Sequence, residues 1–218
     1  MYIIPQPLIQ QELTPTVSTN VFRKASFLTS AYELFQLIPD QGYEVAFAGR
    51  SNSGKSSAIN CLTEQKNLCK TSKTPGRTQL INFFRIEDDR HLVDLPGYGF
   101  ARVSKKMQQH WDEVLTHYLL YRQSLRGLVI VVDIRRGITG LDQGLIDMLD
   151  NRLPLHILLT KSDKLSRNAV NRVVANITKS VNPSRISVST LSVLSREGLD
   201  QLQSRCHRWL ELDQEAVG

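Results

Sequence analysis

The chain has 218 residues, which fits one globular domain with short extensions. Its apolar fraction of 41% and charged fraction of 22% are ordinary for a soluble protein, and its longest apolar run, residues 127–132, is too short for a membrane span. The net charge of +6 favours a polyanionic partner such as RNA, although proteins without one also carry a moderate basic excess.

The cysteines and the N-terminal stretch indicate the cellular compartment in which the protein is expected. Cys61, Cys69 and Cys206 are odd in number and lack metal-ligand spacing, so they suit a reducing environment as small apolar fillers. Residues 1–20 hold several prolines and no apolar export signal. We therefore expect a cytoplasmic monomer with no membrane partner.

In chain order, short β-branched runs alternate with longer amphipathic segments. Strands are predicted over residues 43–48, 80–86, 91–93, 127–132, 155–159 and 185–188. Helices are predicted over residues 55–63, 105–124, 141–150, 167–180 and 198–212. This alternation indicates an α/β fold with a mostly parallel, doubly wound sheet flanked by helices, in which ligands bind at the carboxyl ends of the strands.

A glycine-rich segment links the first predicted strand to the first helix. It matches the pattern G-x-x-x-x-G-K-[ST] and consists of Gly49, Arg50, Ser51, Asn52, Ser53, Gly54, Lys55 and Ser56. Glycines let backbone N–H groups close around phosphates, and the helix N-terminus adds partial positive charge. Lys55 can reach the β- and γ-phosphates, and the Ser56 hydroxyl can ligate Mg²⁺. The segment predicts a nucleoside triphosphate site rather than a chance turn.

A second loop follows the predicted strand 91–93 and consists of Asp94, Leu95, Pro96 and Gly97. Asp94 can hold Mg²⁺ through its water shell, and the Gly97 N–H can approach the γ-phosphate. Taken alone, these four residues form an ordinary turn. Their place after a phosphate loop makes them the magnesium-side loop.

The base-reading motif follows the predicted strand 155–159 and consists of Thr160, Lys161, Ser162 and Asp163. The Asp163 carboxylate can accept bonds from the ring N–H and exocyclic amine of guanine, donors that adenine does not present together. Lys161 can lay its stem along the base and reach back toward the phosphate loop. Ser189 and Thr190, expected just past the last strand, could meet the guanine keto oxygen through backbone N–H groups. The alternative is a solvated polar loop for residues 160–163 and an ordinary turn for Ser189 and Thr190.

A polar stretch, residues 71–78, lies between the first helix and the second strand. A switch loop there must bring a hydroxyl to Mg²⁺ only when the γ-phosphate is present. Thr74 and Thr78 both qualify by chemistry, and their spacing does not choose between them.

With these motifs in place, the chain closely resembles the EngB (YihA/YsxC) family of bacterial ribosome-biogenesis GTPases, a TrmE-Era-EngA-EngB-type group, over about residues 22–210. The most specific stretches are residues 44–52, 72–79, 94–99 and 133–136, the last followed by Asp142.

The resemblance implies a P-loop NTPase fold of the Ras-like G-domain type over residues 43–212, with an N-terminal extension (1–42) and a C-terminal tail (213–218). It implies Ser56 and Thr78 as protein ligands of Mg²⁺, and a role in assembling the large ribosomal subunit, with an association with normal cell division and septation. It extends the GTP/GDP-binding set to Gly76, Arg77, Thr78, Gln79, Leu80, Val188, Ser189 and Thr190.

Two features depart from the family pattern. Val188 stands where the family has an aromatic residue, and the loop 192–198 looks about three residues longer. Both departures concern the base contacts around residues 188–190. They do not affect the prediction that the chain binds a guanine nucleotide.

The residue after Gly97 bears on hydrolysis. Ras-like GTPases place a water-orienting Gln there, whereas this chain has Tyr98, whose phenol is a poor base at pH 7 because its ordinary pKa is about 10. Hydrolysis should then be slow and rest on Mg²⁺, Lys55, Thr78 and backbone donors. Asn52 lies where related GTPases coordinate K⁺, and the alternative is that Asn52 caps its own turn.

Three functional classes follow: a GTPase switch on a ribosomal precursor, a P-loop ATPase or kinase, and a pseudo-GTPase that only binds GTP. Thr160 to Asp163 argue against the second class, and Tyr98 keeps the third open. Contact with ribosomal RNA is expected to be electrostatic, the alternative being a solvated basic face. The basic residues concerned are Lys70, Lys73, Arg77, Arg102, Lys105, Lys106, Arg135 and Arg136.

Overall fold

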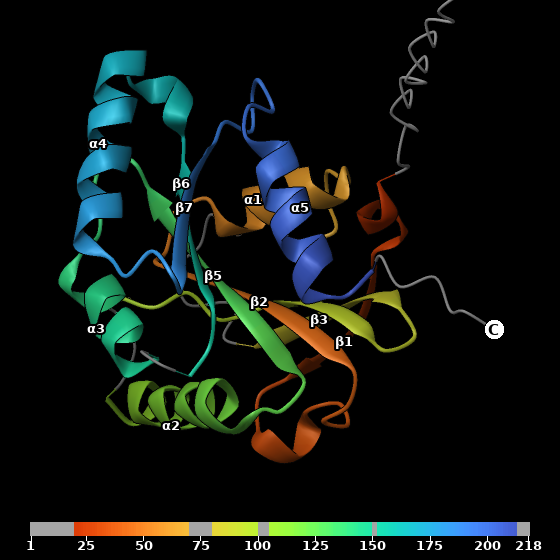
Figure 1. Cartoon of the computed structure of the whole chain (residues 1–218). Coiled ribbons are helices and arrows are strands. Elements are labelled where there is room, and N and C mark those ends of the chain that lie inside the picture. Colours follow the sequence, from red (N-terminus) through yellow and green to blue (C-terminus); the bar gives the residue numbers. More distant parts are fainter. Residues whose placement is uncertain (1–19, 70–79, 100–104, 150–151, 213–218) are drawn as a thin grey trace, which may run out of the picture.

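The computed structural model describes residues 20–69, 80–99, 105–149 and 152–212 (Figure 1). Several residues singled out in the sequence therefore lie outside the described residues: Lys70, Lys73, Thr74, Gly76, Arg77, Thr78, Gln79 and Arg102. No helix in the described ranges combines the length and apolar character needed to cross a membrane.

A seven-stranded sheet forms the centre of the described chain, in the order β1-β3-β4-β2-β5-β6-β7. Every strand runs in the same direction except β3, which pairs antiparallel with both β1 and β4. This confirms the predicted, mostly parallel α/β sheet. The strands are β1 (Ser26–Ala31), β2 (Tyr43–Gly49), β3 (Ile81–Glu87), β4 (Arg90–Asp94), β5 (Leu125–Asp133), β6 (Leu155–Thr160) and β7 (Ile186–Leu191).

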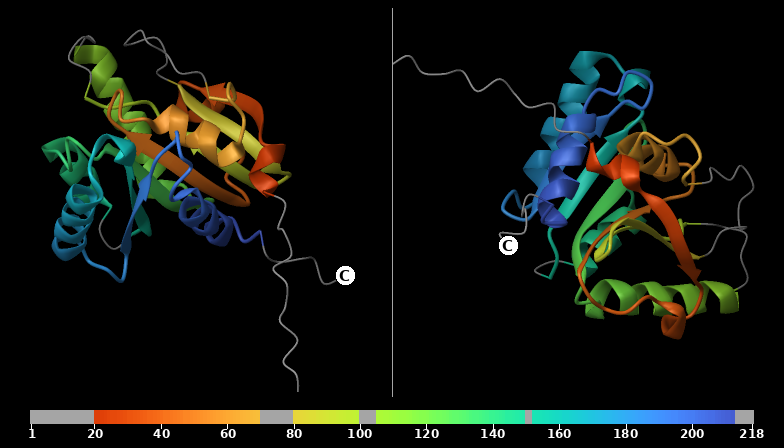
Figure 2. Two further views of the ribbon diagram at one scale, coloured as in Figure 1. Left: turned by 90° about the horizontal axis from the view of Figure 1, so that it is seen from above. Right: turned by 90° about the vertical axis from the view of Figure 1, so that its right-hand side faces the viewer.

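Helices cover both faces of the sheet (Figures 1 and 2). One face packs against α1 (Lys55–Thr63), α5 (Leu199–Trp209) and the short 3-10 helix η1 (Val21–Lys24). The other face packs against α2 (Lys105–Tyr121), α3 (Gly140–Met148) and α4 (Arg167–Ser180). Two further 3-10 turns are η2 (Leu34–Gln36) and η3 (Ser162–Lys164).

Strand β5 shows why this arrangement follows from the sequence. Val129 and Val131 contribute to the core under α1 and α5, whereas Leu128 and Ile130 contribute to the core under the other helices. A strand buried on both faces needs an almost continuous apolar run, and residues 127–132 supply one. The parallel strands β2, β4, β5, β6 and β7 thus place their carboxyl ends along one edge of the sheet.

Strand β1 belongs to the sheet although it lies in the stretch predicted as an N-terminal extension. It pairs with β3 from Ser26 opposite Arg85 to Ala31 opposite Ile81, and Phe22 just before it is 1% exposed. The pairing shifts between Phe27 and Thr29, and Phe27 stays 57% exposed. Such an irregular edge strand lacks the period-2 alternation by which strands are found in sequence.

The last strand corrects the sequence analysis. It was expected over residues 185–188, but β7 runs from Ile186 to Leu191 because its pairing with β6 continues to Thr160 opposite Leu191. Ser189 and Thr190 therefore lie inside the strand and not just past it. The end of the strand was missed because its residues are polar. A polar residue can lie inside this strand because the Ser189 hydroxyl is hydrogen-bonded to the His156 ring at 2.8 Å.

Candidate functional site

The phosphate loop lies between β2 and α1, as predicted. Gly49 ends β2, and Gly54 caps α1 with φ +100°, a left-handed conformation that suits glycine. A Cβ at Gly49 would lie 2.7 Å from the Val131 carbonyl oxygen, so a side chain would force the loop away from β5. Sequence and local geometry therefore agree on a strand–loop–helix unit that presents the first N–H groups of α1.

Lys55 and Asp94 join the phosphate loop to the second loop. Their side chains form an ion pair and are 11% and 9% exposed. The Cys69 thiol donates to the other Asp94 oxygen at 3.1 Å. Burial and the Asp94 charge raise the pKa of Cys69 to about 12, and a hydrogen bond with Ser56 partly offsets this. The Ser56 hydroxyl and the Asp94 carboxylate thus both contact the Cys69 thiol.

These two oxygen groups fit Mg²⁺. This cation takes oxygen ligands and is bound by few protein groups together with water and substrate phosphates. Within the described residues no cluster of three His, Cys, Asp or Glu side chains could hold a metal alone. A site built from Ser56, the nearby Asp94 and nucleotide phosphates agrees with both observations.

The base-reading loop contacts the phosphate loop directly. The Thr160 hydroxyl donates to the Ser53 carbonyl at 2.5 Å. The Lys161 ammonium donates at 2.8 Å to the Asn52 carbonyl, so Lys161 does reach back to the phosphate loop, and at 2.8 Å to the Asp133 carboxylate. Both Asn52 and Lys161 have positive φ, at 63° and 60°. Positive φ is uncommon for residues other than glycine and is concentrated at functional sites. Its occurrence at both residues of this contact therefore supports a functional role for the junction.

Asp133 is a site residue whose role the sequence analysis missed. It ends β5 and accepts bonds from Lys161 and from the Arg135 guanidinium at 2.6 and 2.9 Å. Arg135, and then Lys161, hold the pKa of this carboxyl well below its usual range. Asp133 therefore anchors Lys161 as an anion. The available signal was its position at the carboxyl end of a buried strand.

Asp163 lies at the outer end of the same loop, in η3, with its carboxylate 3.1 Å from Lys164. Lys164 is the main cause that lowers its pKa. Ser192, the first residue after β7, is buried and lies 3.3 Å from an Asp163 oxygen. Ser192 thus occupies the strand-end position that was expected for Ser189 and Thr190.

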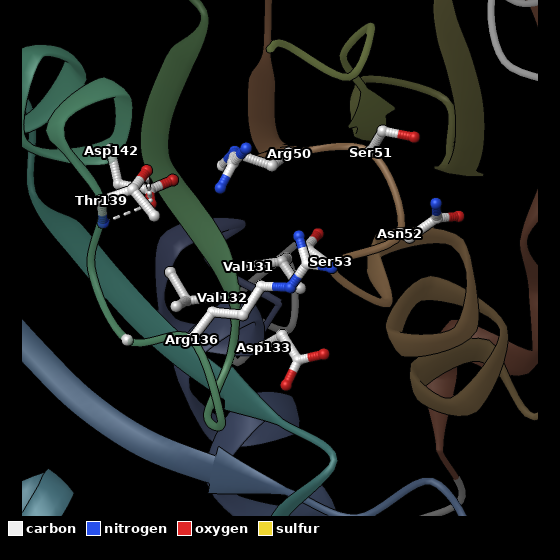
Figure 3. A pocket seen from close by; sticks show the side chains of 11 residues that line it. Arg50, Ser51, Asn52, Ser53, Val131, Val132, Asp133, Arg136, Thr139 and Asp142 are labelled. Atoms are coloured by element: carbon white, nitrogen blue, oxygen red, sulfur yellow. Dashed lines mark hydrogen bonds between the residues drawn. The ribbon is translucent and has the colours of Figure 1, made fainter. Parts of the chain in front are cut away.

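The Tyr98 backbone is bonded to the phosphate loop, where its carbonyl accepts from the Ser51 N–H at 3.3 Å, but its side chain reaches α3. Its hydroxyl donates at 2.6 Å to Asp142, which also accepts bonds from Thr139 in a capping box at the start of α3. Figure 3 shows this contact of Thr139 and Asp142. Burial, together with the Asp142 carboxylate, raises the pKa of Tyr98 far above its usual range. The phenol is a hydrogen-bond donor fixed to α3, not a base.

A cavity of about 1160 Å³ runs along the loops at this edge. It is lined by the phosphate loop, by Asp94 to Gly97 and by Lys161, and it extends past Leu80 to β1 and β3. A second, small cavity of about 10 Å³ lies behind the phosphate loop between Arg50, Asp133 and Asp142 (Figure 3). That volume suits one water molecule at most, so of the two cavities beside the phosphate loop the larger one is the candidate nucleotide site.

Unpartnered buried polar atoms gather at the same edge. In the described ranges, such side-chain atoms are Arg50 Nε, Ser53 Oγ, Ser162 Oγ and, away from this edge, His91 Nδ1. Buried polar groups are normally hydrogen-bonded, and exceptions call for an explanation. Three such atoms on two nucleotide-binding motifs fit a site whose remaining bonds go to a ligand.

The structure thus brings most of the predicted site residues to one edge and separates a few. Val188 and Ser189 line a different cavity, beside α5. A phosphate loop, a magnesium-side loop and a guanine-reading loop on one mostly parallel sheet define a P-loop GTPase fold.

Comparison with known proteins agrees. A family model described as "50S ribosome-binding GTPase" matches residues 44–161. The probable GTP-binding protein EngB of Coxiella burnetii (strain RSA 493 / Nine Mile phase I) is 45% identical over 200 residues, which cover 90% of this chain and 98% of that protein. Its counterpart in Vibrio parahaemolyticus serotype O3:K6 (strain RIMD 2210633) is 48% identical over 191 residues, covering 86% and 87%. The chain belongs to the EngB family of GTP-binding proteins.

Solved structures support the fold. The crystal structure of a probable GTP-binding protein engB superposes with a TM-score of 0.63 at 24% identity, covering 78% of this chain and 99% of that one. Aquifex aeolicus Era bound to GDP.AlF4- gives a TM-score of 0.60 at 19% identity, covering 78% and 57%. At these identities the likeness concerns the fold alone.

Proposed function

We propose that the protein is a cytoplasmic GTPase switch that hydrolyses GTP slowly and acts in assembly of the large ribosomal subunit, with an associated effect on cell division. The observation that carries the GTP part is the junction of Lys161 with Asn52 and Asp133, which fixes the base-reading loop against the phosphate loop. Asp163 follows Lys161 by two residues, in η3, and would accept bonds from a guanine base whose phosphates occupy the phosphate loop.

Mg²⁺ would be held by Ser56 and, through water, by Asp94, together with Thr78 from the family pattern. The ion would neutralise charge on the β- and γ-phosphates during hydrolysis. Lys55 pairs with Asp94 and reaches the same phosphates, so it stabilises negative charge as the bond to the γ-phosphate breaks.

Hydrolysis would proceed without a side-chain base at Tyr98, because that hydroxyl donates to Asp142. Charge stabilisation by Lys55, the N–H groups of α1 and the cations is then the main source of rate. The Asn52 side chain is exposed and bonds to no other group in the described part of the chain, which speaks against the turn-capping alternative. We retain Asn52 as a K⁺ ligand, to be tested by comparing hydrolysis in KCl and NaCl at equal ionic strength.

The ribosomal partner is proposed from the family-model name and the basic charge. Among the expected contact residues, Arg135 pairs with Asp133, which makes it a weaker candidate, whereas Arg136 is exposed beside the small cavity. Contact through Lys105 and Lys106, at the start of α2, stays a prediction.

Three measurements test this function. Titration with GTP, GDP and ATP should show selectivity for guanine nucleotides. Equal affinity for ATP and GTP would instead support the P-loop ATPase alternative. Multiple-turnover phosphate release, with and without large-subunit particles, separates a GTPase from a protein that only binds GTP. Co-sedimentation with those particles should be stronger with a non-hydrolysable GTP analogue than with GDP and should weaken as salt rises.

A further inference from the structure

A polar groove lies between α5 and the edge strand β7, on the sheet face that α5 covers. Its cavity volume is about 270 Å³. The strands contribute His156, Ser187 and Ser189, and α5 contributes Asp200, Arg205 and Arg208. Its lining contains no residue of the phosphate loop, of residues 94–97 or of residues 160–163, but it does contain Val188 and Ser189, which the sequence analysis expected near the base.

The strand side of the groove is polar where the rest of that sheet face is apolar. On the same face, Leu158 and Val129 belong to the hydrophobic core, whereas His156 is 2% exposed and its ring nitrogens lie 2.8 Å from the Ser187 and Ser189 hydroxyls. A buried polar group is the informative exception in a core.

The protonation of this trio leaves a donor for a ligand. Burial, and then Arg205, lower the pKa of His156 to about 4, so the ring is neutral near pH 7. A neutral imidazole has one N–H donor and one acceptor nitrogen. One serine hydroxyl therefore accepts from the ring, and its own hydrogen can donate to another oxygen. For Ser187 the competing acceptor is the Leu155 carbonyl, at 3.5 Å.

The helix side carries two neighbouring guanidinium groups. Arg205 is half-buried, with its guanidinium carbon 5.8 Å from the centre of the Trp209 ring, and Arg208 lies one turn further along α5. Burial, and then the charge of Arg208, lower the pKa of Arg205. Within the described residues neither guanidinium lies within 4.0 Å of a carboxylate, unlike Arg122 or Arg135. Asp200 also lines the groove, so its charged groups sum to +1.

We propose that this groove binds a backbone phosphate of a nucleic acid, with Arg205 and Arg208 on the phosphate oxygens and a serine hydroxyl as a further donor. A phosphodiester carries one negative charge, which matches the groove better than the higher charge of free phosphate. Arginine presents paired donors that suit phosphate oxygens, and such contacts position a nucleic acid without reading its sequence. The volume leaves room for an adjoining sugar. The proposal rests on this groove alone and does not depend on GTP hydrolysis or ribosome binding.

The test uses the full chain loaded with Mg·GDP, so that the phosphate loop is occupied. A short fluorescein-labelled single-stranded RNA is titrated against wild type, Arg208→Gln, Arg205→Gln and the control Arg172→Gln, an exposed arginine on α4. Losing one guanidinium–phosphate contact should weaken binding about tenfold and lower the salt dependence by about one phosphate contact. Arg172→Gln should match wild type.

A second readout locates the ligand. In ¹⁵N NMR spectra the His156 ring signals should move as RNA is added, and inorganic phosphate at the same ionic strength should move them less. Because Arg205 packs near Trp209, its variant could lose stability, whereas Arg208 is exposed and its variant should fold normally. RNA affinity unchanged in Arg208→Gln, or His156 signals that respond only to inorganic phosphate, would overturn the proposal.

Discussion

The two ends of the parallel strands differ in how completely their buried charged groups are paired within the protein. At the amino end of β2, the fully buried Glu44 accepts bonds from the Tyr118 hydroxyl at 2.7 Å and from Arg122 at 2.6 Å. Arg122 also donates to the carbonyl groups of Ile38 and Pro39. This network, Glu44 with Tyr118 and Arg122, is closed within the protein.

At the carboxyl end, the ion pairs Lys55–Asp94 and Lys161–Asp133 also form. Nearby polar atoms, however, have no hydrogen-bond partner among the described residues. Among the described residues, the buried atoms Arg50 Nε and Ser53 Oγ have no hydrogen-bond partner, and Asp163 is exposed. A closed network contributes to stability and specificity of the fold, whereas an open one keeps donors and acceptors for a ligand. Within the described residues, the amino end leaves one unpaired buried side-chain atom, His91 Nδ1, and the carboxyl end leaves three. The comparison teaches that buried charge alone does not identify a site, whereas several unpaired atoms on neighbouring loops point to one.

Removing Glu44 should produce the largest effect and break the closed network. In Glu44→Ala, Arg122 keeps a buried charge without its carboxylate, and breaking such a pair costs about 3–5 kcal/mol of unfolding free energy. Urea unfolding measures this loss, with Glu113→Ala on the exposed part of α2 as control. GTP affinity of the folded variant should stay unchanged; a loss of affinity with normal stability would contradict the division between the two ends.

Removing the charge of Asp163 should do the reverse. Asp163→Asn should weaken GTP binding by about 2–4 kcal/mol, since a charge-assisted acceptor pair is lost, while the unfolding free energy stays the same. Isothermal titration with GTP, against Asp112→Asn on α2 as control, measures the change. If GTP binds equally well, Asp163 does not read the base.

Burial of a titratable ring near the amino end should also appear as a pH effect on stability, at His156, the second residue of β6. Its pKa is lowered from 6.5 to about 4, so between these values the unfolded chain binds a proton that the folded protein does not. Stability contributed by the neutral ring is complete above pH 6.5 and is lost as pH falls toward 4, by up to about 3 kcal/mol at roughly 1.4 kcal/mol per pH unit.

The measurement is the difference in unfolding free energy between wild type and His156→Gln as a function of pH. The difference should change between pH 6.5 and 4 and stay flat above. Carboxyl groups elsewhere titrate in both proteins and cancel. A difference independent of pH would mean that the His156 ring is accessible to protons in the folded state.

Prediction from sequence succeeded where a local pattern suffices. Helix α1 has the expected bounds, 55–63. Its start could be predicted because the phosphate-loop motif and the first helical residues are adjacent in the sequence. The parallel sheet followed from strands alternating with helices. Strand β1 and the end of β7 were missed, since a bulge disrupts one and polar residues fill the other.

Contacts between distant residues could not be predicted in the same way. Glu44 and Arg122 are 78 residues apart, and Lys161 and Asp133 are 28 apart, so no spacing reveals either pair. The motif of residues 160–163 could be recognised because its residues are consecutive, but the contact of Ser192 with Asp163 could not, because it depends on where β7 ends. Tyr98 was identified as a departure from the Ras pattern, yet its partner Asp142, 44 residues on, required the folded chain.

Tyr98 provides the smallest and most discriminating test, because it links the two kinds of network. It follows the magnesium-side loop of the open end, but its hydroxyl donates to Asp142 in the closed capping box of α3. Tyr98→Phe removes that bond and leaves both Thr139 donors on Asp142. The expected loss is about 1 kcal/mol of unfolding free energy, the usual contribution of one hydrogen bond.

GTP hydrolysis should be almost unchanged in Tyr98→Phe, since the hydroxyl is directed at α3 and the ring that packs against the core remains. Single-turnover hydrolysis and urea unfolding are measured on the same preparation, with Tyr121→Phe as an exposed control on α2. A large loss of hydrolysis at normal stability would show that the Tyr98 hydroxyl leaves Asp142 during the reaction and orients the attacking water. A loss of stability at a normal rate would place Tyr98 with the closed network, despite its position beside the nucleotide loops.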